Sequence, residues 1–234
     1  MNQDDLQAAV LWQFGPLQIS ATILTTWCIT ALLAAGCWLL TRRLREQPGT
    51  LQTMVEGVVG AIEQAIGDAV PGATALLLPF IGTLWIFLVA ANLSGLIPGV
   101  HAPTRDLSTT AALALVVFFS THWFGIRDQG VKGYLRHYLE PTPLMLPMTL
   151  ISEITRTIAL AVRLFGNMMS LEMTALLVLV VAGFLAPIPI LMLHIIEALV
   201  QAWIFGMLAM LYIAGGIRAR RQDNTNQTEG VSHA

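Results

Sequence analysis

Residues 154–173, ITRTIALAVRLFGNMMSLEM, place ionisable side chains inside a long apolar segment, and the interpretation of the whole chain starts from them. The segment is apolar enough to be part of a membrane-spanning helix, yet it contains Arg156, Arg163, Asn167 and Glu172. An arginine at the centre of a bilayer costs about 2.5–3.5 kcal/mol on insertion scales, so such residues normally face protein or water and have a function. Arg156 has the alternative of extending to the lipid headgroups, whereas apolar residues on both sides make this difficult for Arg163.

The composition is that of a membrane protein. The chain has 234 residues, of which 56% are hydrophobic and 11% charged, and its mean hydropathy is +0.70. Soluble domains contain about 25% charged residues. The net charge of −2 and the lack of a basic tract give no indication of a nucleic-acid partner. Cys28 and Cys37 would face opposite ways on one helix, so they cannot form a disulfide with each other.

Apolar runs separated by Pro, Gly and charged residues predict an all-α polytopic membrane protein that forms a single membrane domain over residues 1–234. We expect about five transmembrane helices plus one amphipathic surface helix. The predicted spans are residues 17–41, 75–97, 107–125, 144–186 and 190–217. The amphipathic helix is predicted at residues 50–69, where apolar side chains recur at helical spacing, and a solvated loop is the alternative there. We expect a charged loop at residues 125–141 and a disordered polar tail at residues 218–234.

The run from residue 144 to 186 is too long for one perpendicular span. As a helix it would be about 65 Å long, roughly twice the hydrocarbon thickness. It is either one helix that is tilted or bent in the membrane, or a hairpin of two spans that turns at Gly166 and Asn167. The positive-inside rule favours one long tilted helix, because five spans then leave Arg105 as the only basic residue outside. The N-terminus is then outside and the C-terminus is in the cytoplasm, and residues 1–16 lack the basic region of a cleaved signal peptide.

Polar residues of two predicted spans are expected to meet inside the membrane. Arg163 and Asn167 lie on similar faces of the long helix, whereas Glu172 lies on the opposite face, about 13.5 Å further along. The last span carries three polar residues on one broad stripe, namely His194, Glu197 and Gln201. Antiparallel packing of the two helices would bring Gln201 to the depth of Arg163 and His194 to the depth of Glu172. Embedded ionisable groups of this kind often mark ion pathways.

Glu153 and Arg156 form a second polar pair, three residues apart near the predicted cytoplasmic end of the long helix. At this spacing the two side chains are able to form an ion pair. The pair either neutralises charge only, since buried charges are usually paired, or belongs to a cytoplasmic path for ions.

Metal sites and catalysis are not indicated. The chain has no H-E-x-x-H pattern and no Cys/His cluster with ligand spacing. A bis-histidine haem would require His122, which is placed at the end of a span. The sequence also contains no nucleophile–base arrangement and no phosphate-binding loop. We therefore expect no cofactor, no metal and no catalytic activity of this chain alone.

Residues 163–168, RLFGNM, with residues 152–153 and Arg156 before them, resemble the signature of subunit a of the rotary F-type ATP synthases. The segment LPFIGTLWIFLVAANLSGLIPG at residues 78–99 and PTRDL at residues 103–107 are also similar to that family. The resemblance covers most of residues 75–217. Thr157 departs from it, because many members have proline after the basic residue.

The resemblance implies a stator subunit of the membrane Fo sector, with the long tilted helix packed on the c-ring side. In that family two aqueous half-channels lead ions to and from a carboxylate on each c subunit, and Arg163 matches the essential arginine beside this carboxylate. The positions that match channel-lining residues are Asn167, Glu172, His194 and Gln201. Glu197 is an additional carboxylate in the same stripe, and Glu153 and Arg156 are candidates for the cytoplasmic half-channel.

The implied partners are the c-ring subunits, b-type peripheral stalk subunits, the rest of the F1Fo ATP synthase and the lipid membrane. The implied location is the bacterial plasma (inner) membrane. A stand-alone secondary transporter or channel is the alternative, although the internal repeats common in transporters are not visible.

The coupling ion is left open between proton and sodium. Glu197, close to His194 and Gln201, adds oxygen ligands of the kind that sodium favours. A carboxylate near a histidine also serves a proton relay well, and in the family ion selectivity lies mainly in the c-ring. We expect protons, with Glu172 and His194 as relay groups on the entry side.

Overall fold

The computed structural model describes residues 10–14, 17–42, 49–97, 100, 102–139, 145–182 and 187–232. Its helices, in chain order, are α1 (Ala21–Arg42), α2 (Thr50–Ala69), α3 (Thr74–Ser94), α4 (Leu107–Leu139), α5 (Met145–Ala182) and α6 (Pro187–Ser232). A 3-10 turn, η2 (Pro103–Arg105), precedes α4. Near the N-terminus, β1 (Val10–Phe14) pairs with β2 (Leu17–Ser20) in an antiparallel hairpin.

Five helices in the described ranges are long and apolar enough to cross a membrane. These candidate spans are Thr22–Arg42, Thr74–Ser94, Leu107–Arg127, Pro147–Val181 and Ile188–Gly215. The remaining helix, α2, carries three acidic residues along its length, namely Glu56, Glu63 and Asp68. The predicted all-α polytopic membrane fold is confirmed, with the addition of the short hairpin at residues 10–20.

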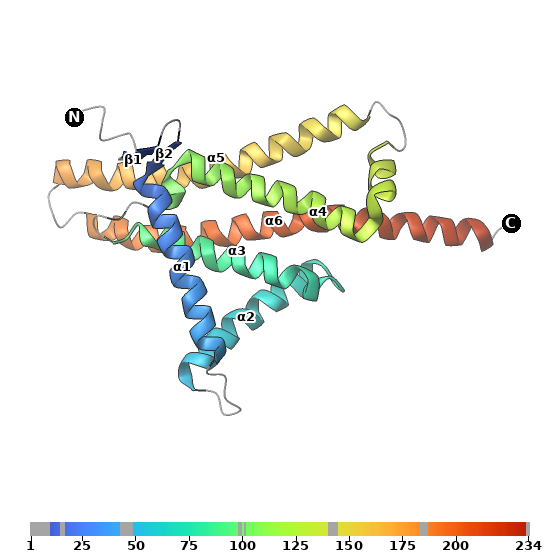
Figure 1. Ribbon diagram of the computed structural model, residues 1–234, viewed down its shortest axis with the longest axis horizontal. Helices are drawn as coiled ribbons and strands as arrows, with labels where there is room; N and C mark the ends of the chain where they lie inside the picture. Colours follow the sequence, from blue (N-terminus) through green and yellow to red (C-terminus); the bar gives the residue numbers. More distant parts are fainter. Residues whose placement is uncertain are drawn as a thin grey trace.

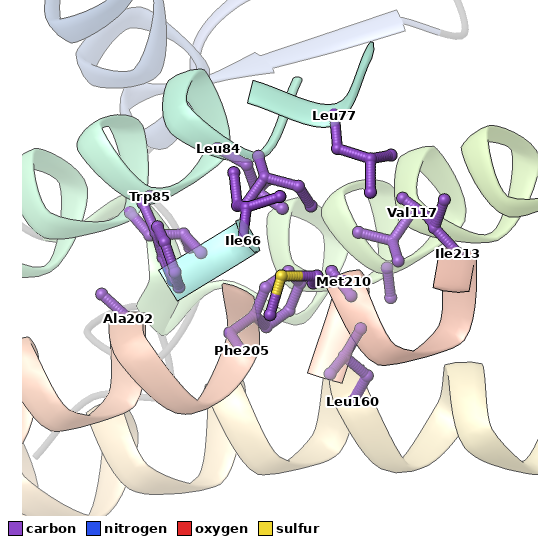
Figure 2. Close-up of a cluster of buried hydrophobic side chains, with 14 of the residues drawn as sticks. Ile66, Leu77, Leu84, Trp85, Val117, Leu160, Ala202, Phe205, Met210 and Ile213 are labelled. Carbon is purple, nitrogen blue, oxygen red and sulfur yellow. The ribbon is translucent and has the colours of Figure 1, made fainter. Parts of the chain in front are cut away.

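The central element is α6, which contacts α3, α4 and α5. In Figure 1 these four helices run alongside one another, while α1 crosses them at a steep angle. Figure 2 shows Phe205 and Met210 of α6 in the middle of a buried cluster that also receives side chains from α2, α3, α4 and α5. Every side chain in the cluster is apolar, so α6 is held in place mainly by packing.

A glycine permits the close approach of α3 and α6. A Cβ atom at Gly206 would lie only 1.7 Å from Nε1 of Trp85. The Trp85 ring stacks on the Trp203 ring with centroids 4.9 Å apart and 5° between the planes. The Trp85 Nε1–H group donates to the backbone oxygen of Trp203 over 3.4 Å. The pair of tryptophans therefore fixes the level of α6 relative to α3, and only glycine fits beneath the Trp85 ring.

The long run after residue 144 is one helix. α5 continues without interruption through Gly166 and Asn167, so the alternative of a hairpin with a turn at these residues is wrong. Its 38 residues correspond to about 57 Å of helix, well beyond the ~30 Å hydrocarbon thickness. A Cβ atom at Gly166 would meet nothing within 4 Å, and its backbone remains helical.

The first spanning helix begins at a later residue than predicted. Residues 17–20 form β2 rather than the first turn of α1, and they pair with β1 in a register that includes Val10 with Ser20 and Phe14 with Leu17. The sequence LQIS alternates apolar and polar residues, which is the period of a strand and not of a helix.

Two segments predicted to be irregular are helical. The expected charged loop at residues 125–141 continues α4 as far as Leu139, with a break only at Gly130, where φ is 72° and ψ is 160°. The expected disordered tail at residues 218–234 continues α6 as far as Ser232. No proline follows Pro189 in α6, so no residue of the tail lacks the backbone N–H group that a helix needs.

Gly206→Ala should lower the midpoint of thermal unfolding of the purified chain in detergent. The added methyl group collides with Trp85, and overpacking costs about 1–3 kcal/mol, which exceeds the gain of about 1 kcal/mol from replacing a helical glycine by alanine. Gly60→Ala is the matched control, because a Cβ atom at Gly60 meets nothing within 4 Å. Equal midpoints for the two variants would show that the Trp85 contact is not tight.

Candidate functional site

Arg163 lies on the exposed side of α5. The residues of α5 that face the other helices recur at helical spacing and include Leu160, Leu164, Met168 and Leu171. Arg163 falls outside this buried stripe and is exposed. It forms neither a hydrogen bond nor an ion pair with any residue in the described part of the chain. A guanidinium on a membrane helix needs water or an anion, and here neither α4 nor α6 provides the anion.

Asn167, one turn beyond Arg163, joins α5 to α6. Its Nδ2 group donates to Oε1 of Gln201 over 2.6 Å. Gln201 is 1% exposed, and its Nε2 atom has no hydrogen-bond partner among the described residues. The antiparallel packing of α5 and α6 therefore brings Gln201 to the level just beyond Arg163, as the spacing in the sequence led us to expect.

A first cavity, the Glu172 cavity, lies where the end of α3, the turn η2, α5 and α6 meet. Its polar lining is made by Arg105, Glu172 and His194, and its volume is about 80 Å³. Since a water molecule needs only about 10–15 Å³, the cavity has room for water. Glu172 and His194 thus lie at one depth, and Glu172 forms an ion pair with Nη1 of Arg105.

His194 is buried and faces this cavity. It is 9% exposed, and its Nε2 atom has no partner among the described residues. A Cβ atom at Gly95 would lie 3.1 Å from Cβ of Ala102 and 3.6 Å from Nε2 of His194. Small residues at the end of α3 and before η2 therefore leave the space in front of the imidazole.

A second cavity, the Glu153 cavity, lies between α4, α5 and α6. Its polar lining includes His122, Glu153, Arg156 and Tyr212, and its volume is about 40 Å³. Nε2 of His122 lies 3.2 Å from Oε2 of Glu153. Nδ1 of His122 lies 2.9 Å from the backbone oxygen of Phe118. Both neighbours of the imidazole are oxygens, one from a carboxylate and one from the backbone.

Arg156 is placed differently from the predicted pair with Glu153. Its guanidinium carbon lies 5.5 Å from the centroid of the Tyr212 ring of α6, at cation–π distance. Glu153, the predicted partner of Arg156, lies beside His122 of α4.

Four of the predicted site residues line neither of these two cavities, namely Arg163, Asn167, Glu197 and Gln201. Glu197 is half-buried on α6, three residues beyond His194. Arg163 and Asn167 lie on α5 between the two cavities, and Gln201 lies on α6 against Asn167.

Three residues of the site were not assigned to it from the sequence. Arg105 and His122 supply the partners of Glu172 and Glu153, and both come from segments distant in sequence. Asn92 of α3 is fully buried and donates from Nδ2 to the backbone oxygen of Ala198, one turn beyond His194. Arg105 was the only Lys or Arg predicted on the outer side of the membrane. This exceptional position could have indicated that it pairs with an acidic residue.

No group of three or more His, Cys, Asp or Glu residues within the described ranges is arranged to hold a metal ion. Cys28 and Cys37 are both exposed and carry free thiols. The polar residues of the site are thus arranged along α5 around two cavities with an exposed cation between them, and not around one centre.

The family model described as ATP synthase A chain matches residues 23–214. The chain belongs to this family. It is 60% identical over 221 residues to ATP synthase subunit a 2 of Pelobacter propionicus, an alignment that covers 93% of this chain and 97% of the relative. It is 61% identical to ATP synthase subunit a 1 of Hahella chejuensis, over 92% of each chain. It is 54% identical to ATP synthase subunit a of Legionella pneumophila, over 94% of this chain and 96% of the relative.

Proposed function

We propose that the chain is the stator subunit of the Fo sector of a rotary ATP synthase and that it provides two aqueous half-channels for the coupling ion. One half-channel includes the Glu172 cavity and opens to the outside, and the other includes the Glu153 cavity and opens to the cytoplasm. The relatives named as ATP synthase subunit a support the role in the complex. The chain itself carries ions, and the chemistry of ATP takes place elsewhere in the complex.

One observation carries the proposal of two half-channels. The two cavities lie along the same continuous helix, on opposite sides of Arg163. Glu153 is ten residues before Arg163 and Glu172 nine residues after it, so the two carboxylates are separated by about 28 Å along the axis. That separation is close to the hydrocarbon thickness of ~30 Å. Water at both carboxylates would therefore reach from each membrane face toward Arg163 without joining.

Buried polar atoms between the Glu172 cavity and Arg163 support a wet path there. Oδ1 of Asn92, Nε2 of His194 and Nε2 of Gln201 have no partner among the described residues. Buried polar atoms of this kind normally bind protein groups or ordered water. These atoms follow one another along the contact between α3, α6 and α5, as far as the Asn167–Gln201 hydrogen bond.

The exposed position of Arg163 suits a partner that brings its own anion. A carboxylate that moves into lipid must be neutral, whereas opposite a guanidinium it is favoured as the anion. Opposite charges about 4 Å apart attract by roughly 4 kcal/mol at an effective dielectric constant of 20. Arg163 would therefore release the ion from each carboxylate of the c-ring that passes it. The same fixed charge would oppose direct passage of cations between the half-channels.

The proposed assembly places the c-ring on the exposed side of α5. The b-type peripheral stalk subunits, the other subunits of the complex and lipid cover the remaining apolar surface, which includes α1, where Thr22 is the only buried residue of the described span. The membrane is proposed to be the bacterial plasma membrane, with the N-terminus outside and the C-terminus in the cytoplasm.

Arg163→Ala should abolish coupled ion transport, because no cation then releases the ion from the passing carboxylate. The measurements are ATP-driven membrane potential and ATP synthesis in inverted vesicles, normalised to the amount of assembled complex. Arg163→Lys is the matched variant that keeps the charge, and it should assemble like wild type. Normal coupled activity of the alanine variant would contradict the proposal.

We further propose protons as the coupling ion, since the Glu172 cavity contains a histidine, a side chain suited to carrying protons. ATP hydrolysis and synthesis by the whole complex at fixed pH should then be independent of sodium concentration. Strong activation by millimolar sodium, with protection of the c-ring carboxylate from carboxylate-modifying reagents, would assign sodium instead and leave the role of Arg163 unchanged.

A further inference from the structure

Arg105 and Glu172 form an ion pair whose role the proposed half-channel function leaves open. Nη1 of Arg105 donates to Oε1 of Glu172, which joins the turn η2 to α5 across 67 residues of sequence. The two side chains are 22% and 30% exposed, so solvent reaches the pair only in part. Both residues line the same cavity as His194.

The turn that carries Arg105 is well anchored. The backbone N–H of Arg105 donates to the oxygen of Ala102 over 3.0 Å, and that of Asp106 to the oxygen of Pro103 over 3.2 Å. Thr104 is fully buried. The guanidinium is therefore presented to α5 from a fixed support, as a positioning group requires.

We propose that Arg105 is a positioning residue that holds the Glu172 carboxylate as a fixed anion, so that His194 is the group of the Glu172 cavity that takes up and releases the transported proton. This inference rests on the proposed half-channel function. A carboxylate that already accepts a hydrogen bond from a permanent cation is a poor proton acceptor. Nε2 of His194, buried, without a described partner and facing the cavity, is the better placed atom.

Among the described residues, few other charged groups lie near His194. The helix α3, which also packs against α6, contains no ionisable residue. On α6, Glu197 is half-buried and lies outside the lining of the cavity. Asp106, next to Arg105, accepts from the backbone N–H of Ser108 at Oδ1 over 3.0 Å and so caps α4. His101 precedes the turn in sequence and lies outside the described residues, so it needs its own control.

The test is the initial rate of ATP-driven membrane potential from pH 6 to 9 in inverted vesicles, per assembled complex. Arg105→Gln should lower the rate at pH 7 at least about fivefold, because the Glu172 carboxylate loses the cation that positions it. Removing the Arg105 cation makes the cavity in front of His194 more negative, so the alkaline limb of the rate–pH curve should move to higher pH by about half a unit or more. Arg105→Lys should retain about half the rate, since it keeps the charge but not the planar fork.

The double variant Arg105→Gln with Glu172→Gln separates charge balance from packing. It removes both charges at once, so it should recover to within about threefold of wild type and restore the wild-type pH profile. If the Arg105–Glu172 ion pair only stabilised the fold, the pH profile of every folded variant would be unchanged. His101→Asn and Arg42→Gln are controls outside the pair, and both should match wild type.

Two results would overturn the inference. One is a wild-type rate and pH profile for Arg105→Gln. The other is a double variant no faster than the slower single variant. Arg163→Ala, run in parallel, distinguishes this failure from failure of the half-channel proposal. If Arg163→Ala loses transport while Arg105→Gln does not, only the role of Arg105 is wrong.

Discussion

A guanidinium on the outward face of a membrane helix is the constraint around which the rest of the chain is arranged. Arg163 carries a charge that it does not lose in proteins, and it has no partner within the described part of the chain. Such a charge is tolerated only beside water or an anion. The polar residues of the neighbouring helices do not neutralise it but line two separate cavities at a distance along α5. In the proposed function, this leaves the place opposite Arg163 for a carboxylate that arrives from another subunit.

Packing on α6 determines where those regions lie. The stacked Trp85 and Trp203 rings and the glycine beneath them fix α6 against α3, and the apolar cluster around Phe205 and Met210 fixes it against α4 and α5. With the level of α6 set in this way, Gln201 reaches Asn167, and His194 reaches the cavity of Glu172. Rigid apolar packing thus positions polar groups that form few strong contacts of their own.

The sequence was most informative where a simple periodicity or a membrane constraint applied. The positive-inside rule favoured one long helix, and α5 is one helix. Helical spacing on two antiparallel helices placed Gln201 near Arg163 and His194 near Glu172. Arg105 and His122 could not be paired with their carboxylates in this way, because those contacts depend on how a turn and α4 are placed in three dimensions. The C-terminal parts of α4 and α6 were not predicted to be helical, because a charged loop and the charged end of a helix have similar amino-acid compositions.

The central claim is that water reaches the Glu153 cavity and the Glu172 cavity from opposite faces of the membrane, and thiol labelling tests it directly. In a chain that lacks Cys28 and Cys37, single cysteines replace Thr157, which lines the Glu153 cavity, and Ala175, which lines the Glu172 cavity. A small charged reagent that does not cross the membrane is added from either side of vesicles that contain the assembled complex. We expect Thr157→Cys to react only from the cytoplasmic face and Ala175→Cys only from the outer face. Reaction of both cysteines from the same face would show one continuous path past Arg163 and would contradict the account.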